Sequence, residues 1–368
     1  MRVVYFGSFD DRASPRVRLL REGLRLAGVE VVECRAGGRV VPRYSRLVSQ
    51  LPQAARGADA LLVGKPGQRE MPLAAVAARA LGLPLLVDYF ASLWLNEVVE
   101  RRRVAAGGFA AWKLRALDRF AWRVAGRCLV DTLAHGRTIA QTLDVDGSRM
   151  RRVFVGAESH FRPLSFARRA GPIEALFVGT FLPFHGIEVV LDAADRLRGE
   201  PRLRITLLGD GPTRSAMEEQ AARLRLENVR FELPLAYERL PERVARADLC
   251  LGLFADSRTA LAVIPKKVFA ALACGKPVVT ADTPGIREAL DETTAYLCAP
   301  GDADALAETL RRALDEPARR VSIGARGRAL HEKRFTPAAI GASCREVIDE
   351  LVVSEPAAAA VAVDEDVP

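Results

Sequence analysis

Two lysines at the start of a predicted helix are the residues best suited to hold an anion. They lie in VIPKKVFAALACGKPVVTAD, residues 263–282, where a proline begins the helix, Gly275 ends it and KPVVTAD is a buried strand. A helix N-terminus attracts phosphate, because its backbone N–H groups are unpaired and its dipole is positive there. Lys266 or Lys267 would add a full positive charge to the anion site that the first turn forms, in which Pro265 and Val268 also lie. The alternative is a lysine on a solvated helix face.

Two other loops follow predicted strands and are rich in glycine. VGTFLPFHGIEVV, residues 178–190, ends a strand and begins a helix near Gly186, and LLGDGP, residues 207–212, contains a tight Gly-Asp-Gly turn. A histidine next to a phosphate site can donate a hydrogen bond to it, although His185 could equally pack against Phe184. The loop residues predicted to contact an anionic ligand are Gly179, Thr180, His185, Gly209 and Gly211.

A basic stripe follows one face of a predicted helix between residues 96 and 127. Arg115, Arg119, Arg123 and Arg127 recur at every fourth position, and apolar residues such as Trp112 occupy another face. Such a stripe suits an anionic lipid surface, although a solvated helix face gives the same pattern. We do not expect nucleic acid as a partner, because the sequence contains no recognised nucleic-acid-binding motif.

The elements that must position these residues alternate between short apolar runs and amphipathic stretches. The predicted strands are VVYFG, VEVVEC, ADALLVG, PLLVDY, RCLVDT and RRVFVG, followed by IEALFVG, LRITLLG, ADLCLGL and KPVVTAD. Alternation of this kind is typical of parallel sheets covered by helices. We therefore predict an α/β fold with two Rossmann-like doubly wound domains facing across a cleft, where ligands bind at strand carboxyl ends.

The predicted boundary is the Pro- and Arg-rich connection PLSFARRAGP at residues 163–172. The domains are then 1–165 and 166–335. A helix at 336–352 could pack back on the first domain, and 353–368 has the composition of a disordered tail.

Composition and charge limit the class of protein. The chain has 368 residues, of which 49% are apolar and 27% charged, as in globular proteins. Its net charge of +8 indicates an anionic partner, which the charge alone does not identify. No apolar run approaches the roughly 18 residues of a membrane-spanning helix, and the acidic start is unlike a signal peptide, so we expect a cytoplasmic protein.

Several motifs of other enzyme classes are absent from the sequence. The six cysteines are scattered and form no C-x-x-C pair, the four histidines lie far apart, and we expect neither a disulfide nor a metal site. The first strand is followed by GSFDDRASPR, which is no dinucleotide fingerprint, so we expect no cofactor. Gly7 and Arg16 in or beside that loop could instead face an anionic ligand.

Several segments, taken in order, resemble a known family. VGTFLPFHGIEVVLDA, LLGDGP, VIPKKVFAALACGKPVVTADTPGIREAL and LCAPGDADALAETLRRAL are similar to the donor domain of retaining glycosyltransferases of the GT-B architecture, in the family GT4. The opening, MRVVYFGSFDDRASPRVRLLREGLRLAGVEVVEC, is similar to the acceptor half. The resemblance covers residues 1 to about 350. It implies retaining, metal-independent transfer of a sugar from a nucleotide diphosphate donor to a glycan or lipid-linked acceptor.

The resemblance also assigns residues. The loop after PLLVDY approaches the donor sugar in that family, so Asp88 is the predicted sugar contact, with His185 and Lys267 as the other catalytic candidates. Lys267 matches a P-x-K-x-F helix start found in part of the group. The family usually has two glutamates at the positions of Ala262 and Ala270, and an Arg and a Lys near Thr180 and His185. The diphosphate charge would therefore depend more heavily on Lys267.

The missing glutamates leave two alternatives open: a catalytically inactive partner subunit, or a sugar-nucleotide epimerase of the same architecture. The donor is expected to contact Gly7, Gly179, Thr180, Gly209, Gly211, Pro265, Lys266 and Val268. The acceptor or an anionic membrane surface is expected on the side of Arg16, Arg115, Arg119 and Arg123, which would place the protein peripherally at the inner face of the cell membrane.

Overall fold

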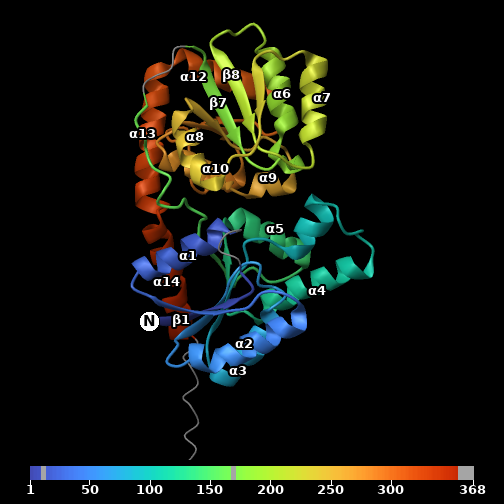
Figure 1. The fold of residues 1–368 in the computed structure, drawn as a ribbon, viewed down its shortest axis with the longest axis vertical. Helices are drawn as coiled ribbons and strands as arrows, with labels where there is room; N and C mark the ends of the chain where they lie inside the picture. Colours follow the sequence, from blue (N-terminus) through green and yellow to red (C-terminus); the bar gives the residue numbers. More distant parts are fainter. Residues whose placement is uncertain (10–13, 167–170, 355–368) are drawn as a thin grey trace, which may run out of the picture. The chain divides into compact units, whose positions relative to one another are not determined.

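The computed structural model describes residues 1–9, 14–166 and 171–354, and its chain forms two compact units (Figure 1). The first unit comprises Met1–Asp131, Ile139–Val153 and the segment from Pro337, and the second comprises Thr132–Thr138 and Phe154–Thr336. The predicted connection at 163–172 lies partly outside the described residues, and so does the predicted tail from residue 355.

Six parallel strands form the sheet of the first unit in the order β2-β1-β3-β4-β5-β6. They are β1 (Arg2–Gly7), β2 (Glu30–Arg35), β3 (Ala60–Val63), β4 (Leu85–Asp88), β5 (Arg127–Val130) and β6 (Met150–Arg152). Strand β3 is apolar throughout and β4 is apolar up to Asp88, and both are fully buried, because helices cover both faces of a parallel sheet.

The helices of the first unit follow its strands. They are α1 (Pro15–Leu26), α2 (Val40–Ala54), α3 (Met71–Leu81), η1 (Leu95–Glu100), α4 (Phe109–Val124), the later part of α5 (Leu133–Leu143) and the C-terminal α14 (Pro337–Ser354). The first residues of α5, up to Thr138, belong to the second unit. Residues of α2, α3 and α4 share one core cluster with the strands. Helix α14 packs on α1 so closely that a Cβ at Gly341 would lie 1.8 Å from the carbonyl oxygen of Gly23.

The sheet of the second unit also has six parallel strands, in the order β12-β11-β10-β7-β8-β9. They are β7 (Ile173–Val178), β8 (Leu203–Leu208), β9 (Val229–Glu232), β10 (Leu249–Leu251), β11 (Val278–Ala281) and β12 (Tyr296–Cys298). The predicted fold class of two doubly wound α/β units is thus confirmed. β9 and β12 were not predicted: β9 alternates apolar and charged residues, and β12 has only three residues.

Helices of the second unit cover both faces of its sheet (Figure 1). Those of one layer are α6 (Ile187–Arg196), α7 (Arg214–Leu224) and α12 (Ala303–Asp315), and those of the other are α8 (Leu240–Arg246), α10 (Lys266–Ala273) and α13 (Pro317–Arg334). Short segments η2 (Pro183–His185), η3 (Tyr237–Arg239), α9 (Arg258–Ala262) and α11 (Pro284–Arg287) complete the unit.

The six cysteines are all buried and none forms a disulfide, as their positions in apolar runs predicted. Burial raises the pKa of Cys34 to about 11 and that of Cys298 to about 12, so these thiols stay protonated at neutral pH. Within the described ranges, every helix is too short or too polar to cross a bilayer.

Candidate functional site

The sheet order of the second unit places two of the predicted loops next to each other. Strand β7 pairs with β8 on one side and with β10 on the other, so the chain reverses its direction of travel through the sheet between β7 and β10. The carboxyl end of a sheet at such a switch point is where open α/β folds bind ligands. The loop after β7 leads through Gly179 to α6, and the loop after β10 leads to α10.

Lys267, in the first turn of α10, reaches back over the end of β7. Its Nζ lies 3.3 Å from the centroid of the Phe177 ring, and a Cβ built at Gly179 would lie 3.0 Å from the same nitrogen. Although the side chain as a whole is half-buried, Nζ is buried and has no hydrogen-bond partner among the described residues. Burial therefore holds the pKa of Lys267 well below that of a solvated lysine.

His185 lies beside this ammonium group. Its ring packs against Phe177 and Phe184, with centroid distances of 5.6 and 4.7 Å. Burial, and secondly the charge of Lys267, lower the pKa of His185 to about 2, so the ring is neutral at physiological pH. His185 therefore packs against aromatic rings, as one alternative predicted, and it also lies next to Lys267, where the other alternative predicted an anion. Its contact with an anion stays a prediction.

The two glycine loops touch through their backbones. A Cβ at Gly209 would lie 1.8 Å from the carbonyl oxygen of Gly179, and one at Gly211 would lie 2.6 Å from the amide nitrogen of Phe181. Both glycines have positive φ values, 146° and 156°, which other residues rarely adopt. The Gly-Asp-Gly segment is therefore more than a tight turn, since its glycines bring the two loops into contact.

Arg214 supports this arrangement and was missed by sequence reasoning. Its guanidinium donates to the carbonyl oxygens of Gly209 and Glu232, and it lies over the rings of Phe181 and Phe231. It therefore holds the turn of the second glycine loop against strand β9. A single arginine after a glycine turn gave no signal that could have identified it.

The other predicted residues of α10 differ in exposure. Pro265 is the N-cap residue, Lys266 is exposed and Val268 is buried. The side chain of Val268 belongs to the core, so a donor could contact only the backbone at this position. Thr180 is exposed at the end of β7.

The positions without glutamates are filled by buried methyl groups. Ala262 and Ala270 are both buried, and the carbonyl oxygen of Ala262 accepts a hydrogen bond from Thr132 Oγ1 at 2.5 Å. A carboxylate does lie in this unit, at Glu288, but it accepts from the backbone N–H groups of Leu133 and Ala134 at 2.9 and 2.7 Å. Glu288 therefore caps the start of α5, a role that the sequence did not indicate.

In the first unit, Asp88 and Arg16 bind each other. Arg16 Nη2 lies 3.0 Å from Asp88 Oδ1, the two side chains are 1% and 0% exposed, and Arg16 also donates to the carbonyl oxygen of Val153 at 2.9 Å. This corrects the prediction that Asp88 contacts the transferred sugar and that Arg16 faces an acceptor, because neither side chain is open to a ligand. Gly7 lies at the end of β1, with a φ of 137°.

Two arginines of the predicted stripe on α4 form hydrogen bonds with residues at the end of α5. Arg115 and Arg123 are both exposed. Arg115 donates to the carbonyl oxygen of Thr142 at 2.9 Å, and Arg119 donates to Asp144 at 3.4 Å. Arg115 and Arg119 therefore hold the helix against the end of α5. Contact of this stripe with a membrane surface stays a prediction.

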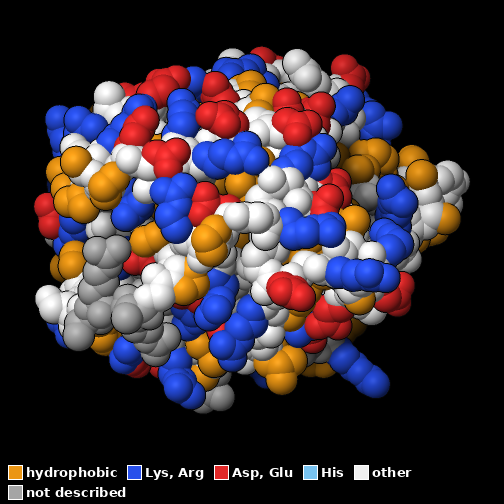
Figure 2. Space-filling view, turned by 90° about the horizontal axis from the view of Figure 1, so that it is seen from above, with side chains coloured by type: hydrophobic (Ala, Val, Ile, Leu, Met, Phe, Trp, Pro, Cys, Tyr) orange, Lys and Arg blue, Asp and Glu red, His pale blue; other side chains and the backbone are white. Residues whose placement is uncertain are grey.

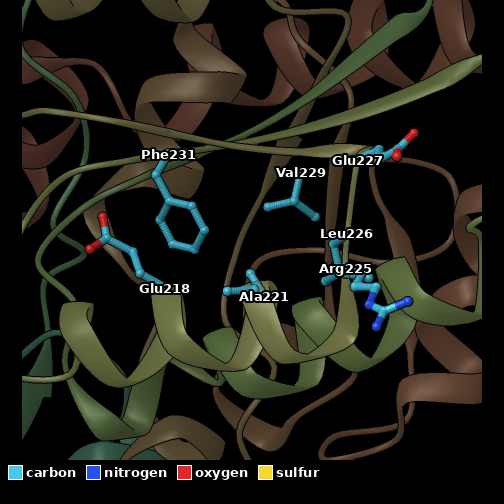
Figure 3. A pocket seen from close by; sticks show the side chains of 8 residues that line it. Glu218, Ala221, Arg225, Leu226, Glu227, Val229 and Phe231 are labelled. Carbon is cyan, nitrogen blue, oxygen red and sulfur yellow. The ribbon is translucent and has the colours of Figure 1, made fainter.

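A separate open hollow of ≈ 390 Å³ lies between α7 and β9. Figure 3 shows Phe231, Val229 and Ala221 facing it, near Glu218 and Arg225. The hollow includes no residue of the loops after β7 and β10, so it is distinct from the site around Lys267. Within the ranges that the structure describes, no three His, Cys, Asp or Glu side chains gather closely enough to hold a metal ion.

Comparison with known proteins finds a family match in the second unit. The family model described as Glycosyl transferases group 1 matches residues 164–330. Glycogen synthase of Mycobacterium tuberculosis is 32% identical over 160 residues, 41% of this chain and 36% of that protein. D-inositol 3-phosphate glycosyltransferase of Kineococcus radiotolerans is 30% identical over 232 residues, 55% of this chain and 52% of that protein. The chain thus spans between a third and about half of these relatives' lengths.

Solved structures share the architecture over nearly the whole chain. The Anabaena protein HepE, in complex with UDP-glucose, has a TM-score of 0.71 at 18% identity and covers 96% of this chain and 100% of its own. At this identity the likeness shows the fold, which is that of GT-B proteins. Together with the family match, this likeness agrees with the resemblance predicted from the sequence: the chain has the GT-B fold, and its residues 164–330 match the family model of the glycosyl transferases group 1.

Proposed function

We propose that this chain is a glycosyltransferase that transfers a sugar from a nucleotide diphosphate donor to a glycan or lipid-linked acceptor. The observation that carries the proposal is the buried ammonium group of Lys267, which has no hydrogen-bond partner in the described part of the chain and lies beside Gly179. A buried charge without a partner costs free energy, which a bound anion would recover. A diphosphate at the start of α10 supplies that anion.

The chemistry asked of this site is stabilisation of the leaving group. As the bond from the sugar to the donor diphosphate breaks, negative charge grows on the phosphate oxygens, and a fixed ammonium group and helix N-termini stabilise it. In other enzymes a divalent cation stabilises this charge. Because Lys267 and the helix N-termini would do so here, we propose transfer without a metal. Retention of the anomeric configuration is proposed from the family resemblance.

The donor's identity is also a proposal. HepE was crystallised with UDP and with UDP-glucose, whereas a Corynebacterium glutamicum relative, 28% identical over 166 residues, is named as a GDP-mannose-dependent mannosyltransferase. Both classes have a diphosphate, which Lys267 would bind, and they differ in base and sugar. Binding of a panel of UDP- and GDP-sugars to the parent and to a Lys267 variant therefore tests first whether Lys267 binds the diphosphate that both classes share.

A second candidate, an inactive subunit that binds a nucleotide sugar or a partner, is favoured by Ala262 and Ala270. Release of nucleoside diphosphate and of sugar, followed with purified protein with and without EDTA, separates the candidates. A transferase hydrolyses one donor slowly in the absence of acceptor. Faster release of nucleoside diphosphate on addition of a glycan or lipid-linked acceptor identifies transfer. NMR of the product gives the anomeric configuration. An epimerase would release the nucleotide together with a free epimerised sugar. No turnover of any donor would contradict the enzyme proposal.

A further inference from the structure

Helix α4 of the first unit presents large aromatic side chains to solvent. Phe109 is 77% exposed, Trp112 64% and Phe120 37%. The rings of Phe109 and Trp112 stack, with a centroid distance of 5.5 Å and an interplanar angle of 20°. Exposed aromatic groups gathered on one helix are unusual on a soluble surface and mark an interaction site.

Basic residues occupy the same side of the helix. At 100° per residue, Phe109, Trp112, Lys113, Phe120 and Arg123 fall within one narrow arc. Lys113 and Arg123 are exposed, like the aromatic residues between them. We call these five residues the aromatic-basic face.

The opposite side of α4 fixes how this face is presented. Ala111, Ala121 and Trp122 are buried, and Trp122 Nε1 donates to the carbonyl oxygen of Asp146 at 2.7 Å. Asp118 accepts from the backbone of Leu93 and Trp94 at 3.1 and 2.8 Å and from Ser92 Oγ at 2.6 Å. The rotation of the helix is therefore set by buried contacts.

The charge around the face has one sign. Residues 101–124 contain seven basic residues and a single acid, Asp118, which is buried. Arg101, Arg102 and Arg103 immediately before the helix are exposed. Two of the seven pair with acids outside this segment, Arg103 with Glu97 at 3.9 Å and Arg119 with Asp144 at 3.4 Å. Over the face of the molecule seen in Figure 2, by comparison, basic and acidic side chains lie intermixed.

We propose that the aromatic-basic face docks on an anionic lipid bilayer. The rings of Phe109, Trp112 and Phe120 would lie at the level of the acyl-chain boundary, and Lys113 and Arg123 would contact phosphate groups of the lipid headgroups. Arg101–Arg103 would add attraction from the adjoining loop. The proposal concerns the surface of the first unit and does not depend on the reaction proposed above.

Two other occupants fit the observations less well. A second copy of this chain would bring seven basic residues against seven, and like charges oppose that association. Single-stranded nucleic acid binds by stacking bases on open ring faces, but Phe109 and Trp112 already stack on each other. An anionic bilayer accommodates both the apolar rings and the excess of positive charge.

The test is binding of the full chain to vesicles of phosphatidylglycerol and phosphatidylcholine, with pure phosphatidylcholine for comparison. The parent should bind the anionic vesicles, and added salt should release it. Lys113→Glu/Arg123→Glu should weaken binding by roughly thirtyfold or more, and Phe109→Ser/Trp112→Ser by roughly tenfold or more. The matched control is Val321→Ser on α13, 72% exposed, which should bind as the parent does.

Tryptophan fluorescence gives an independent readout. The chain has three tryptophans, and only Trp112 belongs to the face, so vesicles should shift the parent's emission to the blue and the Trp112→Phe variant should lose that shift. Circular dichroism verifies that each variant is folded. Phe109→Ser/Trp112→Ser should leave nucleoside diphosphate binding unchanged, which separates this proposal from that of the donor site.

Three results would overturn the proposal. One is a parent that does not bind anionic vesicles at low salt. Another is equal binding by the parent and both double variants. The third is self-association or oligonucleotide binding that the double variants abolish while vesicle binding is absent, which would assign the face to that partner instead.

Discussion

The ammonium nitrogen of Lys267 lies over the ring of Phe177, 3.3 Å from its centroid, with Gly179 and His185 as its other neighbours. The ring face is the electronegative part of an aromatic group, so it attracts the cation. It does not replace hydrogen bonds, however, and Nζ has none to any described residue. The unliganded protein therefore retains a destabilising group at the position where an anion would bind.

We predict that Lys267→Met separates stability from binding. Methionine fills a similar volume without a buried charge, so the free energy of unfolding of the unliganded protein should rise by about 1–3 kcal/mol. Affinity for a nucleoside diphosphate should fall roughly tenfold to a hundredfold, because a charge-assisted hydrogen bond contributes about 1.5–3 kcal/mol. Urea unfolding and calorimetry measure the two effects.

The control for this variant is Lys266→Met, since Lys266 is the exposed neighbour in the same turn. It should change both quantities little. If Lys267→Met binds UDP and GDP as tightly as the parent, Lys267 does not face the phosphates and the donor site must lie elsewhere.

His185 should make the protein less stable as the pH falls. Its pKa is about 2 in the folded protein and about 6.5 when unfolded, so between these values the unfolded state binds more protons. Stability is therefore lost as the pH drops below about 6.5, at up to about 1.4 kcal/mol per pH unit from this group. His185→Gln should have a flatter profile from pH 7.5 to 5.

The contribution of His185 is the difference between the free energies of unfolding of the parent and of His185→Gln at each pH. His331 is also buried, with its pKa lowered to about 4, so part of the parent's slope belongs to His331. His331→Gln is the matched control, whose profile should keep the contribution of His185. Parallel profiles of parent and His185→Gln would show that His185 is not buried in solution.

Breaking the buried pair of Arg16 and Asp88 should strongly destabilise the first unit. Asp88→Asn leaves the guanidinium without its carboxylate in the core, at a cost of about 3–5 kcal/mol. The exposed pair of Arg246 and Glu242 provides the control, and Glu242→Gln should cost no more than about 1 kcal/mol. Nearly equal midpoints for the two variants in urea would contradict the buried pair.

Gly209→Ala should distort both glycine loops of the second unit. The added methyl group would meet the carbonyl oxygen of Gly179, and the backbone φ of 146° is unfavourable for alanine, so we expect a loss of about 1–3 kcal/mol or more. Nucleoside diphosphate affinity should fall as well. Gly199→Ala, where an added Cβ meets nothing within 4 Å, should leave both quantities within error of the parent. A variant at 209 that is as stable as the parent would show that the loops are not in contact.

The sequence by itself determined the fold class, most of the strands and the start of α10. These are local signals: apolar runs of four to six residues mark strands buried on both faces, and proline followed by lysines marks a helix start. The helix start with its two lysines, His185 and the glycine loops were predicted as an anion site in this way, and the family resemblance chose Lys267 over Lys266. β9 and β12 were not, because a short or alternating edge strand lacks the continuous apolar run.

Only the tertiary structure decided which residues meet. Arg16 and Asp88 are 72 residues apart, and each alone looked like a polar group at the mouth of a sheet until the fold brought them together in the core. On α4, the 3.6-residue period defined two faces but not which of them is covered, and buried Asp118, by binding the backbone at 93 and 94, set the rotation that exposes Phe109 and Trp112. The period of the sequence indicates which side chains share a face of a helix. It does not indicate which face is covered, because the covering residues come from other parts of the chain.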